Sequence, residues 1–193
     1  MKPLILASAS PRRKALLQQI GLSFSTVPAS INEDICLSNQ PQQLVQDLAL
    51  RKARYVAADL EQGLVIGADT VVVQDQSIFG KPEDRQDAYV MLSKLNGRDH
   101  EVMTGLALVN AETGEKQLAV EITRVYFRLL SSDELYAYID SGEPFDKAGA
   151  YGIQGLGSVL VERIEGCYYN VVGLPLTRLA QMLLNWDIFI LGG

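Results

Sequence analysis

The sequence of residues 3–21 is PLILASASPRRKALLQQIG, and it predicts a strand, a turn and a helix in direct succession. The apolar run ends at Ala7, and small residues follow it. Ser10 is a favourable helix N-cap, and Pro11 suits the first helical position because its missing N–H would have no partner there in any case. Gly21 then provides a C-terminal stop. A strand that leads directly into a helix favours an α/β fold.

The same alternation continues along the rest of the chain. Further strands are expected over residues 22–27, 64–68, 71–73, 100–110, 117–129 and 158–164, and helices are expected to begin near Pro41, Asp84, Ser131 and Pro175. Ser131 and Glu134 have the spacing of a capping box. No repeat, low-complexity tract or linker interrupts the pattern. We therefore predict one domain over residues 1–193, with a mixed twisted sheet and flanking helices.

Composition excludes several classes of protein. The chain has 193 residues, a net charge of −6 and 48% apolar residues, which is typical of a globular protein. The acidic balance disfavours a general nucleic-acid binder, and no apolar run approaches the roughly 20 residues that span a bilayer. Arginines follow the N-terminal apolar run too closely for a secretory signal, so we expect a cytoplasmic protein without nucleic-acid or membrane partners. Cys36 and Cys167 lack a metal-binding spacing and are expected to be free thiols.

The turn after the first predicted strand is a candidate anion site. Residues from Ser8 to Arg13 lead into a helix N-terminus, where free backbone N–H groups and the positive end of the helix dipole attract anions. Arg12 and Arg13 oppose that dipole, so helix stability gives no reason for them. Their guanidinium groups suit phosphate oxygens, although a solvated basic patch is the alternative.

Lys52 is a second candidate cation. It lies on the apolar stripe of the helix that begins at Pro41, at helical spacing from Leu48 and Ala49. A lysine on such a stripe either extends its ammonium group to the edge of the core or lines a cleft and meets an anion. The sequence leaves both possibilities open.

Asp69 and Thr70 follow the apolar strand 64–68 and form a candidate catalytic position. A carboxylate at the end of a buried strand is costly unless it is paired, hydrogen-bonded or bound to a metal ion, and open α/β sheets bind ligands at strand ends. A turn-capping role is the alternative. The single histidine, His100, lies within a predicted strand and is interpreted as structural. A hydrolase built from this chain would therefore need a carboxylate base and a metal-activated water.

A glycine-rich segment spans residues 142–157 and contains five glycines. Glycine permits close approach of the backbone to a ligand, but a mobile connection would have a similar composition. The segment does not have the pattern of a P-loop.

Four separated motifs together carry a family resemblance. They are residues 8–13 (SASPRR), 69–70 (DT), 80–82 (GKP) and 146–155 (DKAGAYGIQG), and the similarity continues to residues 173–175 (GLP). In this order, the motifs resemble those of the Maf family of nucleotide pyrophosphatases. The resemblance covers nearly the whole chain.

The resemblance implies a fold like that of the inosine triphosphate pyrophosphatases, with two lobes around a cleft. It also implies hydrolysis of nucleoside triphosphates to the monophosphate and pyrophosphate with a divalent cation, Mg²⁺ or Mn²⁺, and a homodimer. Asp69 corresponds to the proton acceptor that activates water and to a metal ligand. Glu33 corresponds to an acidic metal-binding position. Ser8, Arg13, Lys52 and Lys81 correspond to substrate contacts.

Three further positions separate branches of the family. Here they are Arg12, Thr70 and Gln154, which is the pattern of the branch that acts on dTTP and UTP. The branch that acts on 7-methyl-GTP tends to have tryptophan and glutamate in place of Arg12 and Gln154. An amide can donate and accept hydrogen bonds, so Gln154 could match a pyrimidine edge. We therefore predict a dTTP and UTP pyrophosphatase, with CTP or modified pyrimidine triphosphates as further possible substrates.

Two alternatives remain at the level of sequence. One is a nucleotide-binding regulator of septum formation and cell division without turnover, since the family is also associated with that process. The other is a purine pyrophosphatase that acts on 7-methyl-GTP or ITP. Assays of pyrophosphate release across a nucleotide panel would separate the three possibilities.

Overall fold

The computed structural model describes residues 2–32 and 40–192 and confirms an α/β fold. The strands are β1 (Leu4–Leu6), β2 (Ser25–Thr26), β3 (Leu64–Gln74), β4 (Ser77–Phe79), β5 (Asp99–Asn110), β6 (Lys116–Phe127) and β7 (Val161–Glu165). The α-helices are α1 (Pro11–Gln19), α2 (Pro41–Ala57), α3 (Arg85–Leu95), α4 (Ser132–Asp140), α5 (Tyr168–Val172) and α6 (Leu176–Leu184). Short 3₁₀ helices are η1 (Glu143–Asp146), η2 (Ala148–Ala150) and η3 (Gly155–Val159).

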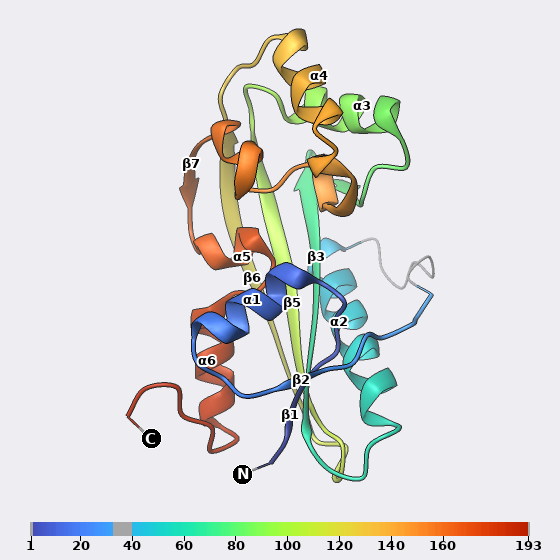
Figure 1. The fold of residues 1–193 in the computed structure, drawn as a ribbon, viewed down its shortest axis with the longest axis vertical. Coiled ribbons are helices and arrows are strands. Elements are labelled where there is room, and N and C mark those ends of the chain that lie inside the picture. Colours follow the sequence, from blue (N-terminus) through green and yellow to red (C-terminus); the bar gives the residue numbers. More distant parts are fainter. Residues whose placement is uncertain (1, 33–39, 193) are drawn as a thin grey trace. The chain divides into compact units, whose positions relative to one another are not determined.

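The described strands form one mixed sheet. Its order is β2-β1-β3-β5-β6-β7, and β4 pairs with β3 outside this path. β1 is parallel to both β2 and β3, whereas β3 with β4 and β6 with β7 are antiparallel. The predicted mixed sheet with flanking helices is therefore confirmed (Figure 1).

Three predicted strand boundaries were wrong. β3 continues through Asp69 and Thr70 without a break, so the carboxylate lies within the strand and not at its end. The strand expected over residues 22–27 is reduced to Ser25–Thr26, because β1 offers only Ile5 and Leu6 as partners. The strand expected from residue 158 begins at Val161, because residues 155–159 form η3.

The chain divides into two compact units that alternate along the sequence. Unit 1 comprises Met1–Asp69, Thr104–Glu121 and Gly173–Gly193, and unit 2 comprises Thr70–Met103 and Ile122–Val172. The boundary falls between consecutive residues of β3, of β5 and of β6. Asp69 is the last residue of the first segment of unit 1.

In unit 1, the α2 helix packs very close to the sheet. Figure 1 shows α2 beside β3. The core of this unit includes small alanines of α2 together with buried residues of β1, β3 and β5. A Cβ atom at Gly67 of β3 would lie 2.1 Å from the carbonyl oxygen of Ala49, and one at Gly105 of β5 would lie 2.1 Å from that of Val45. Both glycines are therefore required, because the backbone of α2 occupies the space of their missing side chains.

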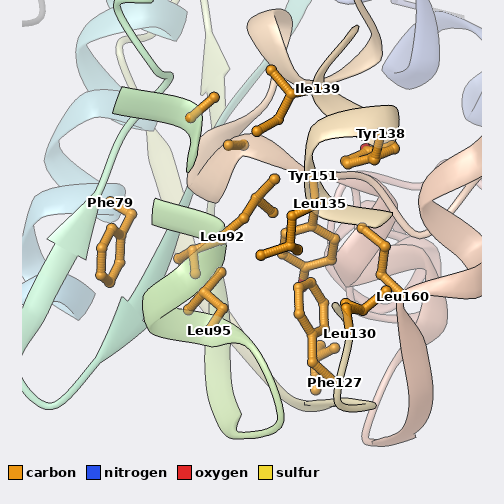
Figure 2. Packing of buried hydrophobic residues seen from close by; sticks show 14 of the residues in the cluster. Phe79, Leu92, Leu95, Phe127, Leu130, Leu135, Tyr138, Ile139, Tyr151 and Leu160 are labelled. Atoms are coloured by element: carbon orange, nitrogen blue, oxygen red, sulfur yellow. The ribbon is translucent and has the colours of Figure 1, made fainter. Parts of the chain in front are cut away.

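Unit 2 has a separate core built around aromatic rings. The α3 and α4 helices lie side by side (Figure 1), and the rings of Tyr89 and Tyr136 stack between them at 4.5 Å. Figure 2 shows Phe127 and Tyr151 within the cluster of buried side chains, where their rings meet edge to face with centroids 4.6 Å apart. This core fixes an interior position of the glycine-rich segment, because Tyr151 belongs to that segment.

His100 is a structural residue of unit 2, as predicted. It is 2% exposed, and its Nε2 lies 2.6 Å from the hydroxyl of Tyr151. Burial lowers the pKa of His100 to about 4, which only the charge of Asp99 opposes. The imidazole is therefore neutral near pH 7.

Candidate functional site

Unit 1 presents the N-terminus of α1 next to the end of β1. The side chain of Ser10 caps α1 by accepting from the N–H of Arg13, and Pro11 begins the helix as expected. The hydroxyl of Ser8, which is buried, accepts from the N–H of Ser10 at 3.1 Å. The two serines thus order the turn that leads into the helix. Arg12, the second residue of α1, is half-buried.

Arg13 is held in place by backbone carbonyl groups. Its Nε donates to the carbonyl of Gly173 at 2.8 Å, and its Nη1 donates to the carbonyl of Ala68 at 2.9 Å. Nη1 also approaches the Ser8 hydroxyl at 3.5 Å. These contacts orient the guanidinium plane and connect α1 to β3 directly before Asp69. The contact with Gly173 could not be predicted from the sequence, because every residue type has a backbone carbonyl group that can accept such a bond.

Lys52 and Asp69 form a buried ion pair. The ammonium nitrogen of Lys52 lies 2.6 Å from Oδ1 of Asp69, and the two side chains are 12% and 10% exposed. Lys52 therefore meets an anion instead of extending into solvent, and that anion is a carboxylate of the protein. Removal of both charges from water is costly, so a pair this buried is weak evidence for a stabilising role and calls for a functional explanation.

The sheet explains why Asp69, although it is buried within a strand, has no residue of β1 paired beside it. β1 ends at Leu6, which pairs with Ile66, and the N–H of Ala7 makes a further bond to the carbonyl of Ile66. Beyond that point β1 no longer flanks β3. Asp69 therefore lies just past the carboxyl end of a parallel strand, where open α/β sheets bind ligands.

These groups together can bind an anion and accept a proton. The arrangement in unit 1 combines a helix N-terminus, a fixed guanidinium and a carboxylate held by an ammonium group. The first two attract phosphate oxygens, and the carboxylate is the only described group among them that can take a proton from water.

The remaining candidates belong to unit 2. Thr70 is half-buried in β3, whereas Lys81 and Gln154 are exposed on segments without regular strand or α-helix. The N–H of Gly149 donates to the carbonyl of Gly80 at 2.9 Å, so the segment before Lys81 is joined to the glycine-rich segment. A Cβ atom at Gly149 would lie 2.8 Å from Val72, which makes this glycine necessary for the close contact with β3.

Two further residues of unit 2, Tyr138 and Glu143, hold the glycine-rich segment. Neither was predicted as a functional residue from the sequence. The carboxylate of Glu143 accepts from the N–H groups of Leu156 and Gly157, and the Tyr138 hydroxyl accepts from the N–H of Gly152. Tyr138 has the spacing of a core residue of α4, and Glu143 follows it by five residues. A glutamate directly before a glycine-rich segment was the available signal.

Among the described residues, Asp69 is the predicted ligand for a divalent cation. Between residues 2–32 and 40–192, no group of three or more His, Cys, Asp or Glu side chains is placed to hold a metal ion. Mg²⁺ usually binds one or two carboxylates together with substrate phosphates and waters, and Asp69 supplies one carboxylate. Glu33, the other predicted ligand, lies outside the described residues, as does Cys36. Cys167 is a free, half-buried thiol, as predicted.

The fold and the site of unit 1 define an α/β protein with a helix N-terminus and a fixed guanidinium near a buried carboxylate, an arrangement that suits an anionic ligand. A family model described as "Maf-like protein" matches residues 3–186, so the chain belongs to the Maf family. No helix within the described ranges is both long and apolar enough to cross a membrane.

Relatives at about half identity share one name. The chain is 51% identical to a "dTTP/UTP pyrophosphatase" of Syntrophomonas wolfei, over 92% of this chain and 94% of that protein. It is 52% identical to a "dTTP/UTP pyrophosphatase" of Acetivibrio thermocellus, over 99% and 98%. Among solved structures, a HAM1 protein from Coxiella burnetii aligns with a TM-score of 0.52 at 14% identity, covering 83% of this chain and 81% of that one. That similarity supports the fold alone.

Proposed function

We propose that the chain hydrolyses dTTP and UTP to the nucleoside monophosphate and pyrophosphate. The observation that carries the proposal is the buried Lys52–Asp69 pair beside the capped N-terminus of α1. A carboxylate base and an anion site are the two elements that this reaction requires. The names of the relatives at 51% and 52% identity support the same activity.

In the proposed reaction, Asp69 accepts a proton from water as the water oxygen bonds to the α-phosphorus. The bond between the α-phosphorus and the oxygen that bridges to the β-phosphorus breaks, and pyrophosphate leaves with that electron pair. Lys52 holds the Asp69 carboxylate in one orientation through the 2.6 Å contact. This role differs from the direct triphosphate contact that the resemblance implied for Lys52.

Ser8, Arg12, Arg13 and Lys81 are proposed to bind the triphosphate. Hydrogen bonds to charged groups contribute roughly 1.5–3 kcal/mol each, and micromolar binding needs about 8 kcal/mol. Three cationic side chains could therefore supply about 5–9 kcal/mol before the costs of desolvation and ordering. The margin is small, so a divalent cation is expected to contribute.

A bound Mg²⁺ or Mn²⁺ would neutralise phosphate charge and increase the electrophilicity of the α-phosphorus. Asp69 would hold it, together with Glu33 as the resemblance implies. Thr70 and Gln154 are proposed to contact the base, with CTP or modified pyrimidine triphosphates as further substrates. The resemblance also implies a homodimer, and the sequence predicts a cytoplasmic location; both stay predictions.

The proposal is tested by release of pyrophosphate from dTTP in the presence of Mg²⁺. We expect Asp69→Asn to lower kcat at least about 100-fold, because a positioned general base contributes roughly 10²–10⁴ in rate. Asp75→Asn is the matched control, since Asp75 is an exposed carboxylate just after β3 that forms its ion pair with Arg98. It should retain wild-type turnover.

A panel of dTTP, UTP, CTP, ITP and 7-methyl-GTP tests the substrate class. Wild-type release of pyrophosphate that does not exceed that of Asp69→Asn would overturn the enzymatic proposal. ITP or 7-methyl-GTP as the best substrate would overturn the pyrimidine preference.

A further inference from the structure

Gln154 lies between Gly152 and Gly155 of the glycine-rich segment, at a position here called the tip. Its own side chain does not fix its position. It is exposed, and although it occupies the N-cap position of η3, its side chain makes no capping bond. Its direction therefore depends on the backbone on either side. The structure shows what holds that backbone.

The carboxylate of Glu143 binds the chain after the tip. Its Oε2 accepts from the N–H of Leu156 at 2.9 Å, and its Oε1 accepts from the N–H of Gly157 at 3.1 Å. Two consecutive backbone donors thus converge on one ionised group. Such bonds are stronger than those between neutral groups.

The hydroxyl of Tyr138 binds the chain before the tip. It accepts from the N–H of Gly152 at 3.3 Å and donates to Oε1 of Glu143 at 3.2 Å. Burial raises the pKa of Tyr138, so the hydroxyl keeps its proton and can act as donor. Tyr138 and Glu143 are therefore hydrogen-bonded to each other and form what is here called the tip clamp. The tip clamp binds the backbone N–H groups of residues 152, 156 and 157.

Two glycines make room for the tip clamp, and a third makes room for Lys147. A Cβ atom at Gly155 would lie 2.6 Å from Oε2 of Glu143, and one at Gly157 would lie 2.8 Å from the Tyr138 hydroxyl. At Gly152 it would lie 2.8 Å from the stem of Lys147. These glycines thus serve contacts within the protein, and the exposed side chains next to them include Gln154 and Leu156.

We propose that Tyr138 and Glu143 are positioning residues that set the preference for pyrimidine bases by holding Gln154. The inference rests on the proposed function, in which Gln154 contacts the base. A misplacement of about 1 Å at a reacting or recognising group can cost as much as about 100-fold. Loosening of the tip clamp is therefore expected to lower the preference about tenfold without removal of any group that touches substrate.

Two conservative substitutions test the proposal. Glu143→Gln keeps the size of the side chain but replaces one acceptor oxygen with an NH₂ group, which cannot accept from a backbone N–H. Tyr138→Phe removes only the hydroxyl. We expect each variant to lower kcat/KM for dTTP about tenfold, mainly through KM, and to change kcat/KM for GTP less than twofold.

The matched control is Asp140→Asn. Asp140 is the last residue of α4, and its exposed carboxylate pairs with Arg85 of α3 at 2.7 Å. This carboxylate-to-amide change should leave the dTTP-to-GTP ratio at the wild-type value. Thermal unfolding of each variant identifies any that fails to fold, and Tyr138→Phe then decides the question if Glu143→Gln is unfolded.

A double variant shows whether the clamp acts through Gln154. Gln154→Ala alone should lower the dTTP-to-GTP ratio, and addition of Glu143→Gln should not lower it further. An equal loss for dTTP and GTP in both clamp variants, or an additive loss in the double variant, would overturn the inference. Failure of the wild-type chain to hydrolyse dTTP would instead overturn the proposed function.

Discussion

Single charged residues of this chain have partners within the protein that their residue type does not reveal. Lys52 and Arg13 were predicted as cations for a triphosphate, and the structure places both in contact with the protein itself. Lys52 holds the carboxylate of Asp69, and Arg13 donates to the carbonyl groups of Gly173 and Ala68. Charge type was therefore predictable from the sequence, whereas the partner of each charge depended on contacts between distant residues.

His100 gives a prediction for acid stability. Its pKa is about 4 in the folded chain and near 6.5 when unfolded, so below pH 6.5 the unfolded state binds more protons and stability falls as pH decreases. Since one pKa unit corresponds to about 1.4 kcal/mol, this residue alone should remove about 2 kcal/mol between pH 7 and pH 5.

Urea unfolding of wild type and His100→Gln at pH 7, 6 and 5 measures this contribution. The glutamine can still bond to Tyr151 but does not titrate, so its stability should fall by about 2 kcal/mol less over that range. Parallel pH dependence in the two proteins would show that His100 does not carry the effect.

At the scale of elements, the position of α2 depends on glycines of the sheet. Gly67 and Asp69 are two residues apart in β3, so their side-chain positions lie on the same face of the strand. The backbone of α2 approaches Gly67 at Ala49 and Ala53, directly beside Lys52. The close contact therefore brings the lysine within reach of the carboxylate.

Gly67→Ala is expected to destabilise the fold by about 2–3 kcal/mol, because a methyl group must push the helix away from the sheet. Gly80→Ala is the control, since a Cβ atom there has open space around it. Urea midpoints give the comparison. Equal stability of the two variants would mean that α2 moves without cost.

Elements were predicted better than their ends. Helix starts at Pro11 and Pro41 and the capping box at Ser131 followed from local chemistry, which the structure confirms. The continuity of β3 did not follow from local chemistry. A carboxylate is tolerated inside a buried strand when it has a partner, and the partner of Asp69 is Lys52, 17 residues earlier in the chain. The tip clamp was missed for the same reason, since Glu143 bonds to backbone groups 13 and 14 residues away.

At the scale of the whole molecule, the two units share strands and have no linker between them. Asp69 and Thr70 are consecutive residues of β3 in different units, and β5 and β6 are divided in the same way. Loss of structure in one unit would remove pairing partners along these strands. We therefore expect one cooperative unfolding transition.

Two probes test that cooperativity. Trp186 is the single tryptophan of the chain, and its Nε1 donates to Gln117, which also belongs to unit 1. Its fluorescence follows unit 1, whereas far-ultraviolet circular dichroism follows both units. Their midpoints should agree within about 1 °C for a two-state transition. Separate midpoints would show that the units unfold independently.

The close contact of the α2 backbone with Gly67 and Gly105 also limits which mutations this chain can accept during evolution. Every single-nucleotide substitution that replaces a glycine introduces a larger residue or a stop, and the helix backbone already fills the space at both positions. No small genetic step can therefore relax this contact gradually. Inherited variation near the ion pair must proceed through other positions, while these two glycines stay fixed although neither has a side chain that could touch a nucleotide.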